Sequence, residues 1–233
     1  SLQHGKYRQK YNQFLVEGAK AVKELLKSDY KITELIIDQD YQEKLSEFYS
    51  HPSLIETDSN NFKKLSALEN PQGILAVAEM KENSIELENF KNTWTIGLDR
   101  IQDPGNLGTI IRLADWYGIE NIFCNRGTVD FYNPKVIQAT MGSFLRVKII
   151  YGDLLEFIST NSIVSYATAM NGESIYQSKH KAGMILIGNE GSGLDEKLIQ
   201  ISAKSLSIPR KGKSESLNAG VAAGIIIDRL LNP

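Results

Sequence analysis

The chain has 233 residues, of which 42% are hydrophobic and 23% charged, enough apolar side chains for one large or two small domains. This composition excludes fibrous and wholly disordered proteins. No apolar run approaches 18 residues and no apolar leader opens the sequence, so we expect a cytoplasmic protein without a membrane span. The one cysteine, Cys124, excludes an internal disulfide and a cysteine-based zinc site and fits a reducing compartment.

The charges are distributed unevenly along the chain. The net charge of −2 argues against a non-specific polyanion binder. Residues 1–31, however, carry seven basic and three acidic residues, whereas residues 32–90 carry four and twelve. Two basic groups are therefore candidates for phosphate contacts, with solvated surfaces as the plainer alternative. They are Lys6, Arg8 and Lys10, and Arg210, Lys211 and Lys213.

The first part of the chain alternates short apolar runs with helical patterns. The expected strands are Phe14–Val16, Leu35–Ile37, Ser53–Glu56 and Ile74–Ala78. The expected helices are Gly18–Leu26, Tyr41–Tyr49 and Asn60–Leu68. Residues 1–80 are thus predicted to form a small α/β domain, and the polar residues 81–93 a linker.

After this linker the alternation restarts. Strands are expected at Trp94–Leu98, Asn121–Cys124, Phe144–Ile150, Val164–Ala169, Met184–Ile187 and Leu206–Ile208. Helices are expected at Leu107–Tyr117, Pro134–Thr140, Asp153–Thr160, Leu194–Ala203 and Leu217–Leu231. The fold class is therefore α/β, and residues 94–233 form a second domain with a mostly parallel sheet covered on both faces. Fifteen of the 18 glycines follow residue 90, so we expect a ligand site beyond the strand ends of this domain.

The first segment of chemical interest runs from Leu98 to Arg112. A strand enters a loop with one proline and two glycines, and a helix follows. Asn106 is expected to cap this helix, and Arg112 lies six residues further on. A helix N-terminus beside an arginine favours an oxyanion or phosphate, although a capped turn with a surface arginine is the alternative.

Two further segments follow strands in the same way. Gly188-Asn189-Glu190-Gly191-Ser192-Gly193 has neither dinucleotide-binding nor P-loop spacing, but its backbone can approach a flat ligand while Glu190 holds a cationic group. The segment Ile208–Ile225 leads from a basic loop into a helix of small residues, and Ser214 or Ser216 is expected to cap that helix. A plain glycine turn and tight helix packing are the respective alternatives.

Other chemistries find no support in the sequence. The histidines, His4, His51 and His180, follow no ligand spacing, so we expect no metal site. A serine-hydrolase elbow, G-x-S-x-G, is missing. Cys124 lies in an apolar strand and is predicted to be a buried structural thiol.

Together the three segments resemble the three motifs of the SpoU (TrmH-type) ribose 2′-O-methyltransferases of the SPOUT superfamily. The matching residues are Asn106, Gly108, Arg112 and Gly118; Gly188 to Gly191 with Gly193; and Ile208, Pro209 and Ser216 to Asn218. Residues 140–147 also match a family segment. The N-terminal part resembles the family's RNA-binding domain, which is similar to ribosomal proteins that bind RNA bends. Departures from the family pattern are Asn189, Arg210 and Ala219.

This resemblance implies a fold, a cofactor and roles for individual residues. It implies a C-terminal trefoil knot, S-adenosylmethionine as methyl donor, and a homodimer in which one subunit completes the other's site. Arg112 would activate the ribose hydroxyl, directly or by orienting an RNA phosphate that takes the proton. The residues that orient the reacting groups would be Asn106, Glu190, Ser216 and Asn218. The residues that hold the adenosine part would be the main chain of Gly188, Ile208 and Leu217, with Thr168 nearby.

The expected substrate is ribosomal RNA, because a separate N-terminal domain suits recognition of a structured stem or bend. Transfer RNA is the alternative substrate. A non-catalytic RNA-binding module of the same fold is a second alternative, against which the presence of Arg112, Glu190, Ser216 and Asn218 argues. A nucleotide-binding oxidoreductase would need a G-x-G-x-x-G fingerprint, which the sequence lacks.

Overall fold

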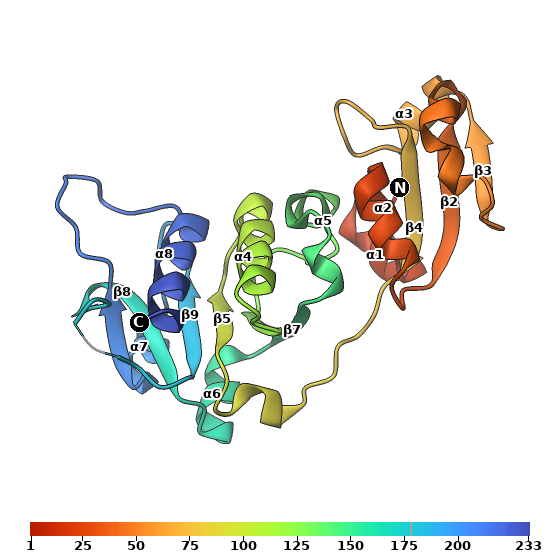
Figure 1. The fold of residues 1–233 in the computed structure, drawn as a ribbon. Helices are drawn as coiled ribbons and strands as arrows, with labels where there is room; N and C mark the ends of the chain where they lie inside the picture. Colours follow the sequence, from red (N-terminus) through yellow and green to blue (C-terminus); the bar gives the residue numbers. More distant parts are fainter. Residues whose placement is uncertain (178) are drawn as a thin grey trace. The chain divides into compact units, whose positions relative to one another are not determined.

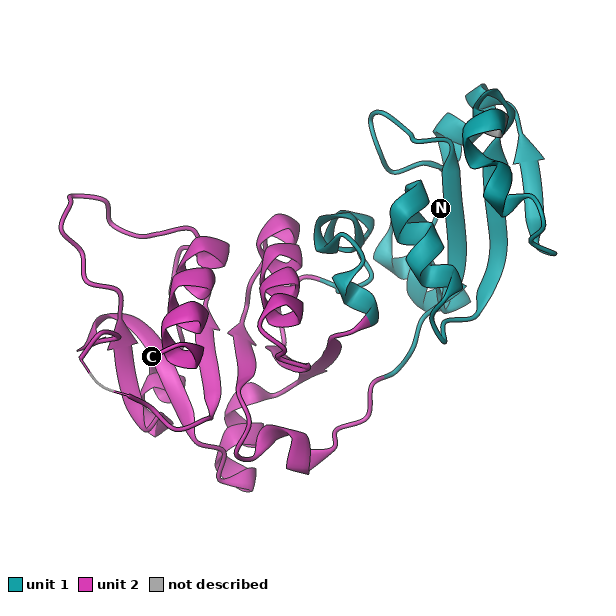
Figure 2. Cartoon of the chain, viewed as in Figure 1, with its two compact units in different colours: residues 1–82, 130–145 teal, residues 83–129, 146–233 magenta. Residues whose placement is uncertain are grey.

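The structure is a computed structural model that describes residues 1–177 and 179–233, with Gln42 described by its backbone only. The chain divides into two compact units, shown in different colours in Figure 2. Unit 1 contains residues 1–82 and 130–145, and unit 2 contains residues 83–129 and 146–233. The second half of the chain therefore contributes a segment of sixteen residues to unit 1.

Unit 1 is built on a mixed four-stranded sheet of order β1-β4-β2-β3. β4 pairs antiparallel with β1 and with β2, whereas β2 and β3 are parallel. The strands are β1 (Gln13–Glu17), β2 (Ile32–Asp38), β3 (Leu54–Thr57) and β4 (Ile74–Glu79). The helices are α1 (Gly5–Tyr11), α2 (Ala19–Leu26), the 3-10 helix η1 (Gln39–Phe48), α3 (Ser59–Leu65), α5 (Pro134–Thr140) and the 3-10 turn η3 (Ser143–Leu145). Alternate residues of the central strands form a core with Phe62 of α3.

Helix α1 was not expected, and it corrects one RNA-binding assignment. Its sequence, GKYRQKY, has no apolar residues at helical spacing, so the sequence pattern does not predict a helix here. The helix is held in place by Arg8, whose Nε and Nη2 donate to Asp130 Oδ2 at 3.0 and 2.6 Å. Its Nη1 donates to the carbonyl oxygens of Leu2 and Gln3, and Arg8 is only 3% exposed. The prediction that Arg8 contacts RNA is therefore wrong, because its guanidinium is buried and already paired, whereas Lys6 and Lys10 are exposed.

Unit 2 is built on a six-stranded sheet of order β10-β8-β9-β5-β6-β7, in which every pair is parallel (Figure 1). The strands are β5 (Thr95–Asp99), β6 (Asn121–Asn125), β7 (Lys148–Gly152), β8 (Ser165–Ser174), β9 (Met184–Gly188) and β10 (Lys204–Ser207). The helices are the 3-10 turn η2 (Leu87–Phe90), α4 (Pro104–Trp116), α6 (Leu154–Asn161), α7 (Glu196–Ile201) and α8 (Ala219–Leu231).

Both faces of this parallel sheet are covered by helices. Met184 and Leu186 of β9 pack with residues of α6 and α7 in one apolar cluster. Because side chains alternate along a strand, Ile185 and Ile187 point to the other face, where α8 lies against β9 and α4. Continuous burial along β5 and β9 follows from this arrangement and explains their unbroken apolar sequences.

The order in which strands are added to the sheet changes side at β5. The strands β5, β6 and β7 follow one another to one side, whereas β9, β8 and β10 lie on the other. Asp99 and Gly188 are paired at the carboxyl ends of β5 and β9, so they mark this switch point. Ligands of open parallel sheets bind beyond such a point.

Two expected elements differ in the structure, and one expectation is confirmed. Residues 144–150 are not one strand, because Phe144 lies in η3, buried against the rings of Phe14 and Tyr30, and β7 begins at Lys148. The segment around Tyr41–Tyr49 forms the 3-10 helix η1 and not an α-helix. Cys124 is buried as expected, and burial raises the pKa of its thiol. Among the described residues, no helix combines the length and apolar character that crossing a membrane requires.

Candidate active site

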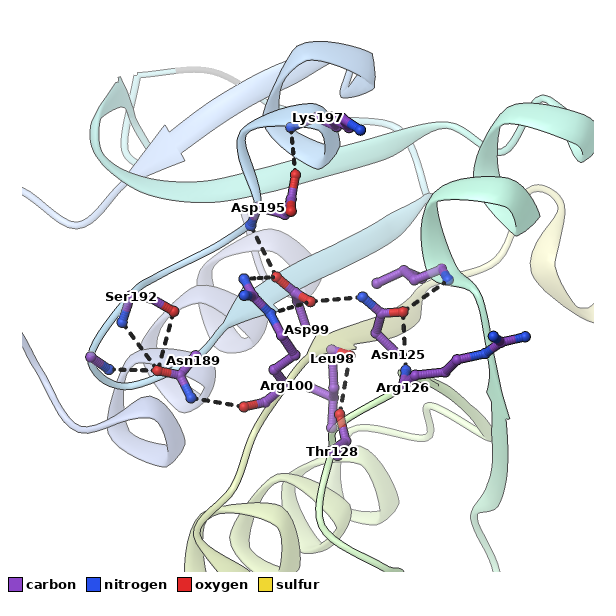
Figure 3. A network of polar contacts seen from close by, with 12 residues as sticks. Leu98, Asp99, Arg100, Asn125, Arg126, Thr128, Asn189, Ser192, Asp195 and Lys197 are labelled. Atoms are coloured by element: carbon purple, nitrogen blue, oxygen red, sulfur yellow. Dashed lines mark hydrogen bonds and ion pairs between the residues drawn. The ribbon is translucent and has the colours of Figure 1, made fainter.

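A fully buried carboxylate joins three chain segments at the carboxyl edge of the unit 2 sheet (Figure 3). Asp99 Oδ1 accepts hydrogen bonds from Arg100 Nε at 3.0 Å and from Asn125 Nδ2 at 2.8 Å. Its Oδ2 accepts from Arg100 Nη2 at 2.8 Å and from the backbone N–H of Asp195 at 2.9 Å. Asp99 thus fixes the ends of β5 and β6 and the loop that follows β9.

The charge of Asp99 is stabilised by these donors. Burial alone would raise the pKa of this carboxyl group. The hydrogen bonds from Arg100, Asn125 and Asp195 outweigh that effect and leave the pKa of Asp99 below its ordinary value. The same pairing raises the pKa of the Arg100 guanidinium.

The glycine loop Gly188–Gly193 is anchored to this cluster through Asn189. Asn189 Nδ2 donates to the carbonyl oxygen of Arg100 at 2.8 Å, and Arg100 adopts the left-handed conformation, with φ of 57°. Asn189 Oδ1 accepts from the backbone N–H groups of Gly191 and Ser192 at 2.9 and 3.1 Å. The departure from the family pattern at Asn189 therefore has a structural role, because this amide closes the loop and attaches it to β5 (Figure 3).

Gly188 has no room for a side chain. A Cβ at this position would lie 2.3 Å from the Leu194 nitrogen and 2.4 Å from the Gly193 carbonyl carbon, both of which are backbone atoms. The loop therefore folds back closely on the end of β9, as the backbone pairing of Asn189 with Gly193 also requires.

Replacing Gly188 with alanine is expected to weaken binding of S-adenosylhomocysteine, the product of methyl donation, at least about tenfold, because the backbone must move to admit the methyl group. Isothermal calorimetry measures this effect. Gly191→Ala is the matched control, since its Cβ would meet only Asn189 Oδ1, at an ordinary 3.5 Å. Equal affinities of the two variants would contradict this account of the loop.

Asn106 and Glu190 bring the first two sequence motifs together. Asn106 Nδ2 donates to Glu190 Oε1 at 2.7 Å. The expected cap role of Asn106 is wrong, because Asp103 precedes α4 and its Oδ1 accepts from the Asn106 backbone N–H at 2.8 Å. With the cap supplied by Asp103, the Asn106 side chain is available to hold the Glu190 carboxylate.

Arg112 is exposed and lies away from this pair on α4. Six residues on an α-helix correspond to about 9 Å along the axis and about 240° around it, so Arg112 does not share a face with Asn106. Within the described residues its guanidinium makes no hydrogen bond or ion pair. Trp116, one turn further along, is 83% exposed. The structure therefore brings Asn106 and Glu190 together but does not bring Arg112 to them in one chain.

The third motif lies in a loop that is exposed to solvent. Ten consecutive residues, 209–218, are exposed, and Figure 1 shows them as a long loop before α8. Ser214 and Ser216 do not cap α8, because Asn218 Oδ1 accepts from the backbone N–H groups of Gly220 and Val221 at 3.0 and 3.2 Å. Ser216 and Leu217 are exposed beside this cap.

The basic residues of this loop have different surroundings. Arg210 Nη1 donates to the carbonyl oxygen of Ser214 at 3.2 Å and so supports the loop itself. The side chains of Lys211 and Lys213 are exposed. The loop is therefore shaped in part by its own arginine, while its two lysines face solvent.

The helix that follows the loop packs closely on α4. A Cβ on Gly220 would lie 3.0 Å from Thr109 Cγ2, which explains why small residues open α8. This packing places the start of α8, with its Asn218 cap, against the helix that carries Asn106 and Arg112.

Three predicted cofactor-binding residues, Thr168, Gly188 and Ile208, lie in or directly after the neighbouring strands β8, β9 and β10. The Thr168 hydroxyl donates to the Leu186 carbonyl oxygen at 2.8 Å, which ties β8 to β9. In the pairing of β8 with β10, residues 168–172 bulge out, since Ser205 faces Ala167 and the next residue, Leu206, faces Glu173. Gly188 is the last residue of β9 and Ile208 follows β10, whereas Thr168 lies within β8, the strand between them; Leu217 lies at the far end of the exposed loop.

Sequence reasoning missed Asp99 and Asn125. A signal was present, because each is a polar residue that ends an apolar strand, Thr95–Asp99 and Asn121–Asn125. Among residues 1–177 and 179–233, the structure contains no group of three or more His, Cys, Asp or Glu side chains arranged to hold a metal ion.

Comparison with known proteins agrees with this arrangement. Residues 93–228 match the SpoU rRNA Methylase family, and residues 1–76 match the MRM3-like substrate binding domain. The chain is 31% identical to the 23S rRNA (guanosine(2553)-2′-O)-methyltransferase RlmP of Bacillus subtilis, over 97% of this chain and 91% of that protein.

Two solved structures have the same fold over nearly the whole chain. An AdoMet-bound rRNA methyltransferase from Sinorhizobium meliloti superposes with a TM-score of 0.84 at 28% identity, covering 98% of this chain and 90% of the other. A TrmH-family protein from Porphyromonas gingivalis gives 0.83 at 31% identity, covering 98% and 93%. The chain therefore belongs to the SpoU rRNA methylase family.

Proposed function

We propose that this chain is an S-adenosylmethionine-dependent RNA 2′-O-ribose methyltransferase that acts on ribosomal RNA. The observation that carries the proposal is the hydrogen bond between Asn106 and Glu190, which joins two family motifs at the carboxyl edge of a parallel sheet. Ribosomal RNA is preferred over transfer RNA because the full-length relative RlmP is named for methylation of 23S rRNA. We place this activity in the cytoplasm.

The residues at the strand ends fit the proposed cofactor. Gly188 lets the backbone of Gly193 and Leu194 fold back against the end of β9, so backbone and not a side chain fills this strand end, as close approach of a flat adenine ring requires. The backbones of Gly188, Ile208 and Leu217 would hold the adenosine part, with Thr168 beside it. S-adenosylmethionine supplies, when bound, an electrophilic methyl group. We propose that the C-terminal segments around this site form the trefoil knot of the superfamily.

In this proposal the polar residues position and activate the ribose 2′-hydroxyl. Arginine stays charged at all relevant pH values, so Arg112 acts by holding the hydroxyl and an adjacent RNA phosphate, which takes the proton. Glu190 holds the Asn106 amide, and the oxygen of the Asn218 amide is used by the helix cap, which leaves its N–H groups to donate. Ser216 contributes a hydroxyl from the exposed loop. Positioning of the two reacting groups supplies most of the rate enhancement.

We propose further that the enzyme is a homodimer in which Arg112 serves the partner's site. Arg112 lies on a different face of α4 from Asn106, and the large exposed ring of Trp116 lies one turn away on the Arg112 side. An exposed tryptophan of this size is typical of an interface. A second copy that covers α4 would bury Trp116 and carry Arg112 to a second Asn106–Glu190 pair.

RNA would be bound by both units. We propose residues 1–80 as the RNA-binding domain, to which the structure adds residues 130–145 of unit 1, residues 81–93 as a linker, and the remainder of residues 94–233 as the methyltransferase domain. Lys6 and Lys10 offer exposed charges on α1, and the loop before α8 offers Arg210, Lys211 and Lys213.

Replacing Arg210, Lys211 and Lys213 with alanine is expected to weaken RNA binding and to reduce the slope of log K against log salt by about two, since each phosphate contact contributes about 0.7–0.9. Fluorescence anisotropy titrations at several salt concentrations measure this slope. Lys63→Ala/Lys64→Ala, in α3, is the control for lost charge elsewhere. A slope equal to that of the wild type would remove these residues from the RNA-binding surface.

The experiment that tests the function is transfer of a tritiated methyl group from S-adenosylmethionine to unmodified transcripts. We expect label in 23S rRNA, at a ribose that stops reverse transcription at low nucleotide concentration. Label only in transfer RNA would favour the alternative substrate. Binding of S-adenosylhomocysteine and RNA without any label would favour a non-catalytic RNA-binding module.

A further inference from the structure

Unit 1 contains a cavity of about 520 Å³ that the proposed methyl-transfer site does not use. It lies between the end of β1, the loop of residues 66–73 and helix α5. Its apolar lining includes Leu15 and Leu68, and its polar lining includes Asn70, Gln72, Gln138 and Lys135. The volume lies within the range of small-molecule sites and is large enough for one nucleotide.

The backbone of the loop that walls this cavity is held in place by buried or partly buried groups. Glu17, at the end of β1, accepts hydrogen bonds from Ser66 Oγ and, at 2.7 Å, from the Ala67 N–H. At the other end of the loop, the Gly73 carbonyl oxygen accepts from the Asp38 N–H at 2.9 Å. A loop fixed at both ends presents its side chains without a large ordering cost on binding.

The polar side chains that line the cavity, from the loop and from α5, are uncommitted. Within the described residues, the amide groups of Asn70, Gln72 and Gln138 make no hydrogen bond, and neither does the Lys135 ammonium. Gln72 rests on Gly18, which has φ of 93°, and its Oε1 lies 2.7 Å from the place that a Cβ would take. The backbone of Gly18 therefore makes room for one wall of the cavity. A loop held at both ends that presents two free amide groups, beside a third on α5, is suited to recognition rather than to packing.

We infer that this cavity holds one unpaired nucleotide of the RNA substrate, an inference that rests on the proposed function. Amide side chains both donate and accept, as the edges of nucleobases require, while Leu15 and Leu68 offer an apolar surface to the base. Lys135 supplies the charge for a phosphate, and Glu69 at the rim accepts from a base amino group. Bases in an A-form duplex are closed to such side chains, so the nucleotide must lie outside the helix.

The match of residues 1–76 to a substrate binding domain includes the loop that walls the cavity. Every residue that lines the cavity belongs to unit 1, whereas the Asn106–Glu190 pair belongs to unit 2. Recognition of the RNA and methyl transfer would therefore take place at different sites.

The test compares five fluorescein-labelled RNA hairpins. Four differ only in one extruded A, C, G or U, and the fifth is fully paired. We expect the full-length wild type to bind at least one extruded hairpin about tenfold more tightly than the paired one. Asn70→Ala/Gln138→Ala should bind all five equally, with unchanged affinity for S-adenosylhomocysteine.

The matched control is Gln9→Ala/Asn60→Ala, which removes one glutamine and one asparagine that are exposed in unit 1 outside the cavity. It should keep the wild-type preference. Equal binding of all five hairpins by the wild type, or a preference that survives in Asn70→Ala/Gln138→Ala, would overturn the inference. Failure of the proposed function has a different signature, namely loss of S-adenosylhomocysteine binding or of methyl transfer while the hairpin preference remains.

Discussion

Replacing Arg112 with alanine is expected to lower kcat for methyl transfer at least about a hundredfold and to leave S-adenosylhomocysteine binding unchanged. Arg112 is exposed, and within the described residues its guanidinium makes no hydrogen bond or ion pair, so we expect its loss to affect the RNA step alone. Single-turnover methylation and calorimetry measure the two quantities. Arg112→Lys keeps the charge but loses the planar pair of donors, and should recover only part of the rate.

The proposal that Arg112 serves the partner's site predicts complementation between two inactive variants. A mixture of equal amounts of Arg112→Ala and Glu190→Gln should regain about a quarter of the wild-type rate, because half the dimers are mixed and each has one intact site. Variants of two residues in the same chain's site would regain nothing. Full activity of Arg112→Ala would remove Arg112 from the mechanism altogether.

Replacing Asp99 with asparagine is expected to destabilise the folded chain by about 3 kcal/mol, because the new amide group would face donors from Arg100 and its neighbours. For a chain of this size the midpoint of thermal unfolding should fall by about 6–12 °C. The substitution weakens the contact of Asp99 with the Asp195 N–H, one of the two contacts that attach the loop after β9 to the end of β5, so S-adenosylhomocysteine should also bind more weakly. Glu156→Gln, on the surface of α6, is the control for a lost acidic charge.

The effect of Asp99 depends on pH in a defined direction. Its pKa in the folded chain lies below the value of about 3.9 that it has in the unfolded chain. Its contribution to stability is therefore complete well above pH 4 and is lost as the pH falls through the folded pKa. The difference in unfolding temperature between wild type and Asp99→Asn should shrink between pH 7 and pH 3. A constant difference over this interval would show that the charge of Asp99 is not what stabilises the cluster.

The sequence predicted the strands of unit 2 well, because strands buried on both faces have continuous apolar runs that polar turns separate. It could not predict helix α1, which has no apolar stripe and is held by one arginine. The partner of that arginine, Asp130, is 122 residues away in the chain, and no local pattern reveals such a pair. Because this partner is distant in the sequence, Arg8 was predicted to be an exposed charge that contacts RNA.

The sequence likewise predicted some features of the candidate site and not others. The family resemblance implied that Asn106 and Glu190 lie close together, and the structure joins their side chains by a hydrogen bond because both follow neighbouring strands of one sheet. The sequence did not distinguish Asp103 from Asn106, or Ser216 from Asn218, as helix caps. Aspartate, asparagine and serine are all good caps, and the choice depends on where the backbone turns into the helix. The role of Asp99 depends on three segments that only the fold brings together.

The assignment of residues 130–145 to unit 1 affects how the chain can be divided by proteolysis or by gene fusion. The chain passes from one unit to the other after residues 82, 129 and 145. A single cut near residue 83 would therefore leave Asp130 and α5 attached to the wrong fragment, and Arg8 would lose its buried carboxylate. Exchange of the RNA-binding part between relatives would have to transfer both segments of unit 1 together.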